Sequence, residues 1–119
     1  MQYQPIEIIT AELKSSALDS ELITGFGQAC AYRLFSHKTY LVIPSTDSGT
    51  SDEMLDRLTT LCRIFGIGLV TYDSSNIDDP NFQALMRAIK YEPDMFYVED
   101  FLSNLERSIP KNDFEELLY

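Results

Sequence analysis

Hydrophobic residues gather along this chain in short runs that alternate with longer, periodic segments. Three runs are rich in β-branched and aromatic residues and have the length of strands. The other segments repeat hydrophobic residues every three or four positions, which predicts amphipathic helices. The predicted strands are residues 6–13, 38–44 and 67–72, and the predicted helices are residues 18–36, 52–65, 82–89 and 96–105.

The order of these elements predicts an α/β fold. Strands joined by helices favour parallel pairing with right-handed crossovers. Because the strands are almost uninterrupted apolar runs, we expect a central mixed or parallel sheet flanked by helices on both faces, in three layers. The first helix is expected to pack through Leu22, Phe26, Cys30 and Leu34, which recur every four residues. Gly66 follows the second helix and is expected to end it.

Length and composition limit the classes of protein to consider. A chain of 119 residues suits one domain, which we expect over residues 1–109, followed by an acidic tail over residues 110–119. No apolar run is long enough to span a membrane, and no secretory signal is recognisable. The two cysteines, Cys30 and Cys62, lie in apolar segments and form no CxxC pair. They predict core thiols of a reduced, cytoplasmic protein and argue against a zinc site.

The net charge of −10 argues against a protein that coats nucleic acid through charge alone. It leaves room for a metal-dependent enzyme, because carboxylates gather metal ions.

Glu12 and Lys14 are the first candidates for chemistry. Two residues apart on a strand, they would project from the same face, at the carboxyl end where α/β folds place their sites. A carboxylate that binds Mg²⁺ beside an ammonium suits phosphodiester hydrolysis. A solvated pair at a strand end explains the same tripeptide, and this plainer interpretation stays open at this point.

Gln28 and Tyr32 are four residues apart on the first predicted helix and therefore share a face. Glu21 and Gly25 extend this face into a stripe of polar and small residues, distinct from the hydrophobic stripe. Small residues around the pair permit close approach of a strand or of a substrate backbone. An ordinary, partly exposed helix face with a packed tyrosine is the alternative.

The combined pattern resembles the PD-(D/E)xK, or restriction-endonuclease-like, nuclease superfamily. The resemblance covers about residues 6–72 and includes the carboxyl-terminal part of that family's core. An ExK tripeptide at a strand end is followed by a serine-containing turn, a helix with a GQ-x-x-AYR motif and an apolar strand that ends in proline. The matching segments are residues 11–16, 27–33 and 40–44, with a later strand over residues 66–70.

The resemblance implies a metal-dependent nuclease. Glu12 would be the second metal ligand, Lys14 the catalytic lysine, and the backbone carbonyl of Leu13 a further ligand. Gln28 and Tyr32 match the family's Q-x-x-x-Y helix motif and would face the substrate. The implied cofactor is Mg²⁺ or Mn²⁺, and the implied partner is DNA or RNA.

One departure from the family's pattern is serious, because its first acidic residue is missing upstream of Glu12. Glu7 lies at an odd offset from Glu12 and would face the opposite side of the strand. Asp19 and Glu21 are the nearest replacements, with Asp19 as a further metal ligand, although both also suit a helix N-terminus. The chain is therefore expected to be a fragment, a half-domain completed by a second copy or a partner domain, or an inactive relative.

Three functions remain in competition: a Mg²⁺-dependent nuclease domain, a non-catalytic interaction module on the same scaffold, and an unrelated α/β binding domain. No glycine-rich loop supports a nucleotide-phosphate site. His37 and Asp73 are secondary candidates, for phosphate contact and for an electrostatic role beside Glu12. A surface turn is the plainer explanation of each of them. The unpaired first strand is an aggregation liability, which predicts that another copy covers it.

Overall fold

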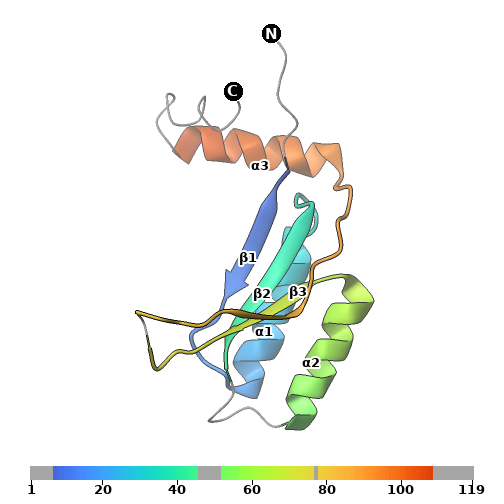
Figure 1. The fold of residues 1–119 in the computed structure, drawn as a ribbon. Coiled ribbons are helices and arrows are strands. Elements are labelled where there is room, and N and C mark those ends of the chain that lie inside the picture. The colour runs from blue at the N-terminus through green and yellow to red at the C-terminus, as the bar shows by residue number, and fades with distance from the viewer. Residues whose placement is uncertain (1–6, 46–51, 77, 109–119) are drawn as a thin grey trace.

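The computed structural model describes residues 7–45, 52–76 and 78–108. Within them the chain forms four strands and three helices (Figure 1). In chain order these are β1 (Ile9–Leu13), α1 (Asp19–Tyr32), β2 (Lys38–Pro44), α2 (Asp52–Phe65), β3 (Gly68–Tyr72), β4 (Gln83–Met86) and α3 (Met95–Ser108).

The four strands form one sheet in the order β1-β2-β3-β4. β1, β2 and β3 are parallel, whereas β4 runs antiparallel to β3. The predicted α/β class with a mixed sheet is therefore confirmed. Parallel pairing brings the carboxyl ends of β1, β2 and β3 to the same edge of the sheet.

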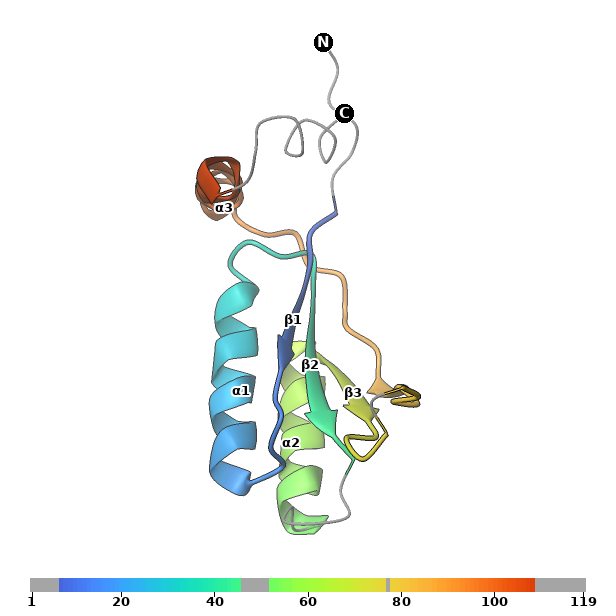
Figure 2. The same cartoon turned by 90° about the vertical axis from the view of Figure 1, so that its left-hand side faces the viewer.

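The expected third layer is wrong for the described residues. α1 and α2 cover the same face of the sheet (Figure 2). Side chains alternate along β2, so that Leu41 and Ile43 are buried under the helices while Val42 is only half-buried on the other face. On β1 that other face leaves Ile9 58% and Leu13 64% exposed. We refer to it below as the open face.

The apolar segment after β3 accounts for this difference. Residues 82–89, predicted as a helix, instead contain β4 and extended chain. Asn81 has a positive φ of 47° in the turn that precedes β4. The backbone groups of this segment then form hydrogen bonds with β3. This is a tertiary effect, which periodicity in a short apolar run cannot indicate. The last predicted helix is present as α3, where Asp94 caps the N-terminus by accepting the Phe96 amide at 2.8 Å.

α1 is shorter than predicted and is rotated relative to the predicted stripe. It ends at Tyr32, and Leu34 beyond it is 50% exposed. The predicted hydrophobic stripe is therefore only partly correct, because small residues form much of the buried side of the helix. The buried residues of α1 are Leu22, Gly25 and Ala29, with Phe26 and Cys30 packed at the margin.

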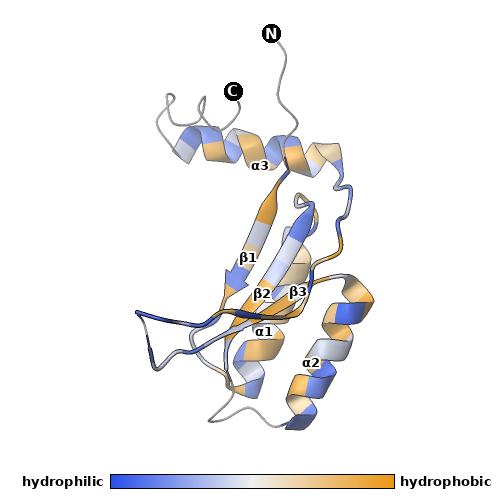
Figure 3. Cartoon of the chain, viewed as in Figure 1, coloured by the Kyte–Doolittle hydropathy of each residue, from blue (hydrophilic) through white to orange (hydrophobic). Residues whose placement is uncertain are grey.

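The hydrophobic core lies between the sheet and these two helices. α2 shows hydrophilic and hydrophobic bands in alternation, as its period predicts (Figure 3). Cys62 is buried in the core, and burial raises the pKa of its thiol to about 12. Cys30 lies at the core margin, and both cysteines are free thiols. The fully buried side chains of the core are Leu22, Ala29, Leu41, Ile43, Leu58, Cys62, Ile67 and Leu69.

α3 lies across the end of the sheet where β1 begins (Figure 1). Its Phe101 ring stacks on Phe35, with ring centroids 4.6 Å apart and planes only 6° from parallel. Val98 is buried on the same helix. The opposite end of the sheet, where the parallel strands have their carboxyl ends, is therefore not covered by α3.

The end of α2 generates a prediction about stability. Gly66 has a φ of 68°, and the Ile67 amide donates to the Cys62 carbonyl at 2.9 Å, which is the hydrogen bond of a Schellman motif. Gly66→Ala should cost about 1–2 kcal/mol of unfolding free energy, because a Cβ disfavours the left-handed conformation. Urea unfolding measures this change.

Gly27→Ala is the matched control. Gly27 lies in the middle of α1, and an added Cβ there would meet nothing within 4 Å. This substitution should instead stabilise the protein by roughly 0.5–1 kcal/mol, since alanine is the better helix former. Equal effects of the two substitutions would contradict the assigned turn.

Candidate functional site

Glu12 and Lys14 project from the same face of β1, beneath α1. Their side chains are 14% and 15% exposed, and Lys14 Nζ lies 3.7 Å from Glu12 Oε1. The sequence prediction that this carboxylate and ammonium point together is confirmed. The pair sits at the carboxyl end of β1, on the edge of the sheet that α3 leaves open.

Tyr32 reaches the pair from the far end of α1. Its hydroxyl donates a hydrogen bond to Glu12 Oε2 at 2.6 Å. This hydrogen bond is the largest cause that raises the pKa of the Tyr32 phenol, ahead of burial and the nearby Glu12 charge. One Glu12 oxygen therefore accepts from Tyr32, and the other faces Lys14.

Gly25 makes room for this arrangement. A Cβ at this position would lie 2.9 Å from Cγ and 3.0 Å from Cε of Lys14. Real Cβ atoms essentially never approach so closely, so the lysine stem occupies the space that the missing side chain leaves. The sequence analysis expected close approach at the small residues around Gln28 and Tyr32; it occurs instead at Gly25, whereas a Cβ at Gly27 would meet nothing within 4 Å.

Glu21 joins the site as a second carboxylate. Its Oε2 lies 3.7 Å from Lys14 Nζ, while its side chain is 49% exposed. The sequence placed Glu21 on the polar stripe of the helix and offered it as a replacement acid or a helix N-terminal residue. Asp19 lies at the exposed start of α1, and Gln28 is also exposed. Within the described residues neither forms an ion pair or a hydrogen bond with Glu12 or Lys14.

Glu7 turns away from this cluster, as the sequence predicts. Its carboxylate forms ion pairs with Lys38 at 3.3 Å and Lys90 at 3.9 Å. It therefore supplies no second ligand beside Glu12.

The backbone of Leu13 faces the outer edge of the sheet. Lys14 donates its amide to the Val42 carbonyl, and the Ile8 carbonyl accepts from the chain before β2. Since alternate residues of a parallel strand bond to one neighbour, the groups of Leu13 point away from β2. In the described part of the chain β2 is the only strand beside β1, so no strand lies on the side that the Leu13 groups face. The Leu13 carbonyl therefore has no strand partner among the described residues.

Tyr72 is a residue of this site that the sequence analysis missed. The ladder geometry directs the Lys14 carbonyl towards the backbone nitrogen of residue 44, which is Pro44 and has no N–H. The Tyr72 hydroxyl donates to that carbonyl at 2.7 Å instead. The available signal was a proline at the end of an inner strand, which leaves a neighbouring carbonyl without its donor.

His37 and Asp73 have local structural roles. The Ile8 amide donates to His37 Nδ1 at 2.9 Å, and the His37 amide donates to the Ile8 carbonyl at 2.8 Å. His37 therefore holds the start of β1, far from Glu12 along the strand. Asp73 accepts from the Ser75 amide and hydroxyl, and these bonds lower the pKa of its carboxyl group.

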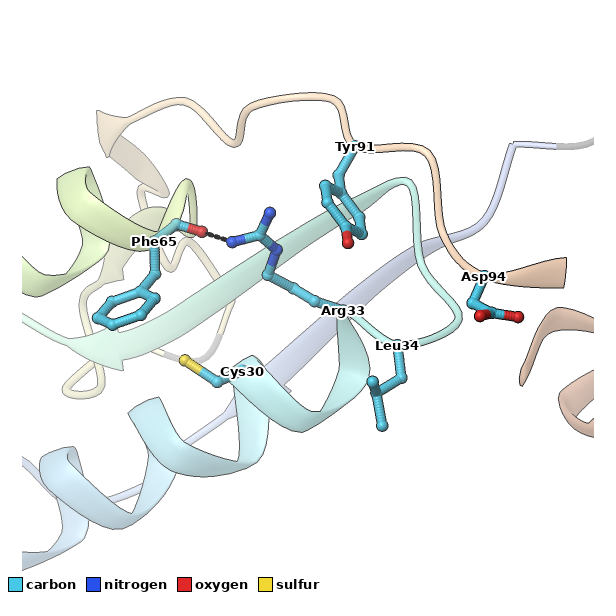
Figure 4. A pocket seen from close by; sticks show the side chains of 6 residues that line it. All are labelled: Cys30, Arg33, Leu34, Phe65, Tyr91 and Asp94. Atoms are coloured by element: carbon cyan, nitrogen blue, oxygen red, sulfur yellow. Dashed lines mark hydrogen bonds between the residues drawn. The ribbon is translucent and has the colours of Figure 1, made fainter. Parts of the chain in front are cut away.

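A second group of contacts lies at the carboxyl end of α1, around Arg33 (Figure 4). The Arg33 guanidinium donates to the Phe65 carbonyl at the end of α2 and stacks over the Tyr91 ring, 4.5 Å from its centroid. These residues line a pocket of about 250 Å³. Arg33 is the one cation among the lining residues, and the Phe65 carbonyl and the Tyr91 ring already bind it. We therefore interpret Arg33 as a structural link between the ends of α1 and α2.

The donor set suits a weakly held hard cation better than a closed metal site. In the described residues no group of three histidine, cysteine or acidic side chains could enclose a metal ion. Mg²⁺ needs only one or two carboxylates, with water and substrate phosphate as its other ligands. Glu12, with the Leu13 carbonyl beside it, fits that requirement, provided that Lys14 moves from Glu12 Oε1.

Comparison with known proteins adds no relative: no protein-family model, curated protein or solved structure matches this chain. Among the described residues, no helix combines the length and apolar character needed to cross a membrane.

Tyr72 and Pro44 generate a second prediction. Tyr72→Phe should cost about 1 kcal/mol of unfolding free energy, because the Lys14 carbonyl loses its donor. In a Pro44→Ala background the restored N–H takes over, and the same substitution should cost much less. A double-mutant cycle by urea unfolding measures the difference.

Tyr40→Phe serves as the control for lost hydroxyl groups. Tyr40 is half-buried on the open face, and its hydroxyl forms no hydrogen bond within the described residues. Its removal should be close to neutral in both backgrounds. An equal cost of Tyr72→Phe with and without Pro44 would show that the hydroxyl does not replace the missing donor.

A third prediction concerns the Tyr32 phenol. Its pKa should lie above the ordinary value of 10 and fall in Glu12→Ala, which removes the hydrogen-bond acceptor. Because the folded-state pKa is the higher one, the pair stabilises the fold below that ordinary value. This contribution disappears as pH rises through the raised pKa. Carbon-13 NMR of labelled tyrosine rings measures it; an unchanged Tyr32 titration in the variant would contradict the contact.

Proposed function

We propose that this chain carries part of a metal-dependent nuclease site of the PD-(D/E)xK type, acting on DNA or RNA. The observation that supports it best is the convergence of three residues from two separate motifs. Glu12 and Lys14 face the same space, and Tyr32 from the following helix hydrogen-bonds to Glu12. A solvated ExK tripeptide would not need this partner or this degree of burial.

In this proposal Glu12 and the Leu13 carbonyl hold Mg²⁺ or Mn²⁺ at the outer edge of β1. A bound divalent ion supplies a hydroxide nucleophile near neutral pH and neutralises charge on the phosphate. Lys14 stabilises the negative charge that develops on phosphate oxygens. Tyr32 orients Glu12 through one oxygen and leaves the other for the ion. Glu21 is the nearest second carboxylate, on the flank of the site.

An interaction module on the same scaffold is the second candidate. Lys14 lies between two carboxylates and is largely covered, so it is neutralised where it stands. β1 also presents an edge with no neighbour among the described residues, next to exposed Ile9 and Leu13. Such an edge is a template for pairing with another strand. A second copy or a partner domain would then complete the sheet.

The expected cellular location belongs to the same proposal. Two free thiols, one of them buried in the core, suit a reducing compartment such as the cytoplasm.

Calorimetric titration with Mg²⁺ and Mn²⁺ tests the proposed site. Binding should occur in the unmodified protein and disappear in Glu12→Ala, because that substitution removes the only carboxylate on β1 that faces the site. Glu7→Ala is the matched control, since Glu7 lies on the other side of the strand with Lys38 and Lys90. It should leave metal binding unchanged.

Cleavage assays on single- and double-stranded substrates follow if metal binds. Lys14→Ala should then abolish cleavage while the metal still binds. Metal binding that is absent, or equally strong in Glu12→Ala, would remove the support for a nuclease site in this chain and favour the interaction module.

A further inference from the structure

The open face of the sheet contains a second concave site at the same strand ends. It is a pocket of about 420 Å³, formed where β1 and β3 end and the chain turns towards β4. Its position at the carboxyl edge of parallel strands is where α/β folds usually bind ligands. The lining residues are Leu13, Ser15, Tyr72, Asp73, Ser74, Pro80 and Phe82.

An aromatic side chain stands exposed in this pocket. Phe82 is 64% exposed, although Tyr72 lies beside it with ring centroids 6.2 Å apart and planes inclined at 48°. A phenylalanine that served only to fill the core would be buried. Phe82 instead leaves most of its ring accessible at the mouth of a cavity, which suits stacking against a flat ligand.

The Asp73 carboxylate lines the same pocket. Asp73 Oδ1 accepts hydrogen bonds from the Ser75 amide at 2.9 Å and hydroxyl at 2.6 Å. These bonds fix the carboxylate and lower its pKa, so it stays ionised and acts only as an acceptor. An ionised acceptor favours a flat ligand that carries N–H donors on its edge, and it repels one that presents carbonyl oxygens there.

The pocket and the Glu12–Lys14 site share one piece of backbone. Leu13 and Ser15 line the pocket, while Lys14 between them projects to the opposite face. Tyr72 belongs to the pocket wall and donates its hydroxyl to the Lys14 carbonyl at 2.7 Å. A flat ligand on Phe82 is therefore held next to the strand end from which the proposed phosphate-directed residues extend.

We infer that this pocket takes one unstacked nucleobase of a single-stranded nucleic acid, with an amino-bearing base, guanine above all, preferred over uracil. Guanine presents two adjacent N–H donors on its Watson–Crick edge, which match a carboxylate. Uracil presents one N–H between two carbonyl oxygens. Stacking of a base on an aromatic side chain contributes to such binding and tolerates any base, so the preference between bases comes from the carboxylate. The inference rests on the proposed nuclease function for the class of substrate.

Nucleosides test the pocket independently of metal and phosphate. Guanosine and uridine are titrated in EDTA and followed by amide chemical shifts in NMR. Guanosine should bind more tightly and shift the amides around Tyr72 and Phe82. Because the probe lacks phosphate and the buffer lacks divalent ions, failure here is distinct from failure of metal binding at Glu12.

Two variants locate and explain the binding. Phe82→Ala should weaken guanosine binding by roughly five-fold or more, the usual effect of losing one stacked ring, whereas Phe82→Tyr should retain it. Phe96→Ala removes a comparably exposed ring from α3, 70% exposed, and should have no effect. Asp73→Asn keeps an acceptor for the turn but adds donors, so it should lose the preference for guanosine over uridine.

Any of three results would overturn the inference. They are the absence of nucleoside binding, binding that survives Phe82→Ala, and equal affinity for both nucleosides that Asp73→Asn does not change. Urea unfolding of each variant identifies a loss of fold, and Phe82→Tyr keeps the ring if Phe82→Ala does not fold.

Discussion

The close approach of α1 to β1 at Gly25 is the constraint on which the candidate site depends. A side chain there would meet not only the Lys14 stem but also Leu41 Cδ1, at 3.1 Å. Leu41 is fully buried in the core, so it cannot move aside cheaply. Residue 25 therefore fixes the separation of the helix from two strands at once. Tyr32, two turns further along, then stands close enough to Glu12 for a hydrogen bond of 2.6 Å.

The end of β1 depends on a second constraint, which comes from Pro44. Proline ends β2 without an amide donor, and the carbonyl of Lys14 would be left without its ladder partner. Tyr72 fills this role from β3, across the width of β2. The hydroxyl that stabilises the strand end also belongs to the wall of the pocket on the open face. The hydrogen bond that supplies the missing backbone donor thus connects the two faces of the sheet through a single residue, Tyr72.

The sequence was most informative where local patterns and tertiary packing agree. β2 and α2 have the predicted bounds, and Gly66 ends α2 as expected. The common direction of Glu12 and Lys14 also followed from the strand period, whereas the hydrogen bond from Tyr32 to Glu12 arises from the packing of α1 on β1. Prediction failed where a partner far along the chain decides the conformation. β4 forms because β3 offers its edge, which an apolar run of eight residues does not reveal.

The same limit explains what was missed within the site. Tyr72 acts through a proline 28 positions earlier, and neither residue signals the other locally. Glu21 was visible in the sequence as an acid near a helix N-terminus, where the macrodipole explains it equally well. Only the packing of α1 shows that its carboxylate reaches Lys14. The third layer, which the described residues lack, was mispredicted because apolar residues on a strand show that a face is hydrophobic, without showing what covers it.

The two candidate functions differ in what happens to Lys14 when Glu12 is neutralised. Glu21 is half exposed, and such a partner holds a lysine only weakly. Glu12 is largely covered and oriented by Tyr32, so it contributes most of the attraction. A divalent ion on Glu12 would remove that attraction and repel the ammonium. Gly25 confines the lysine stem, so Nζ would then be held by Glu21 alone. In a scaffold without metal the same ion pair stays closed and only stabilises the packing of α1 on β1.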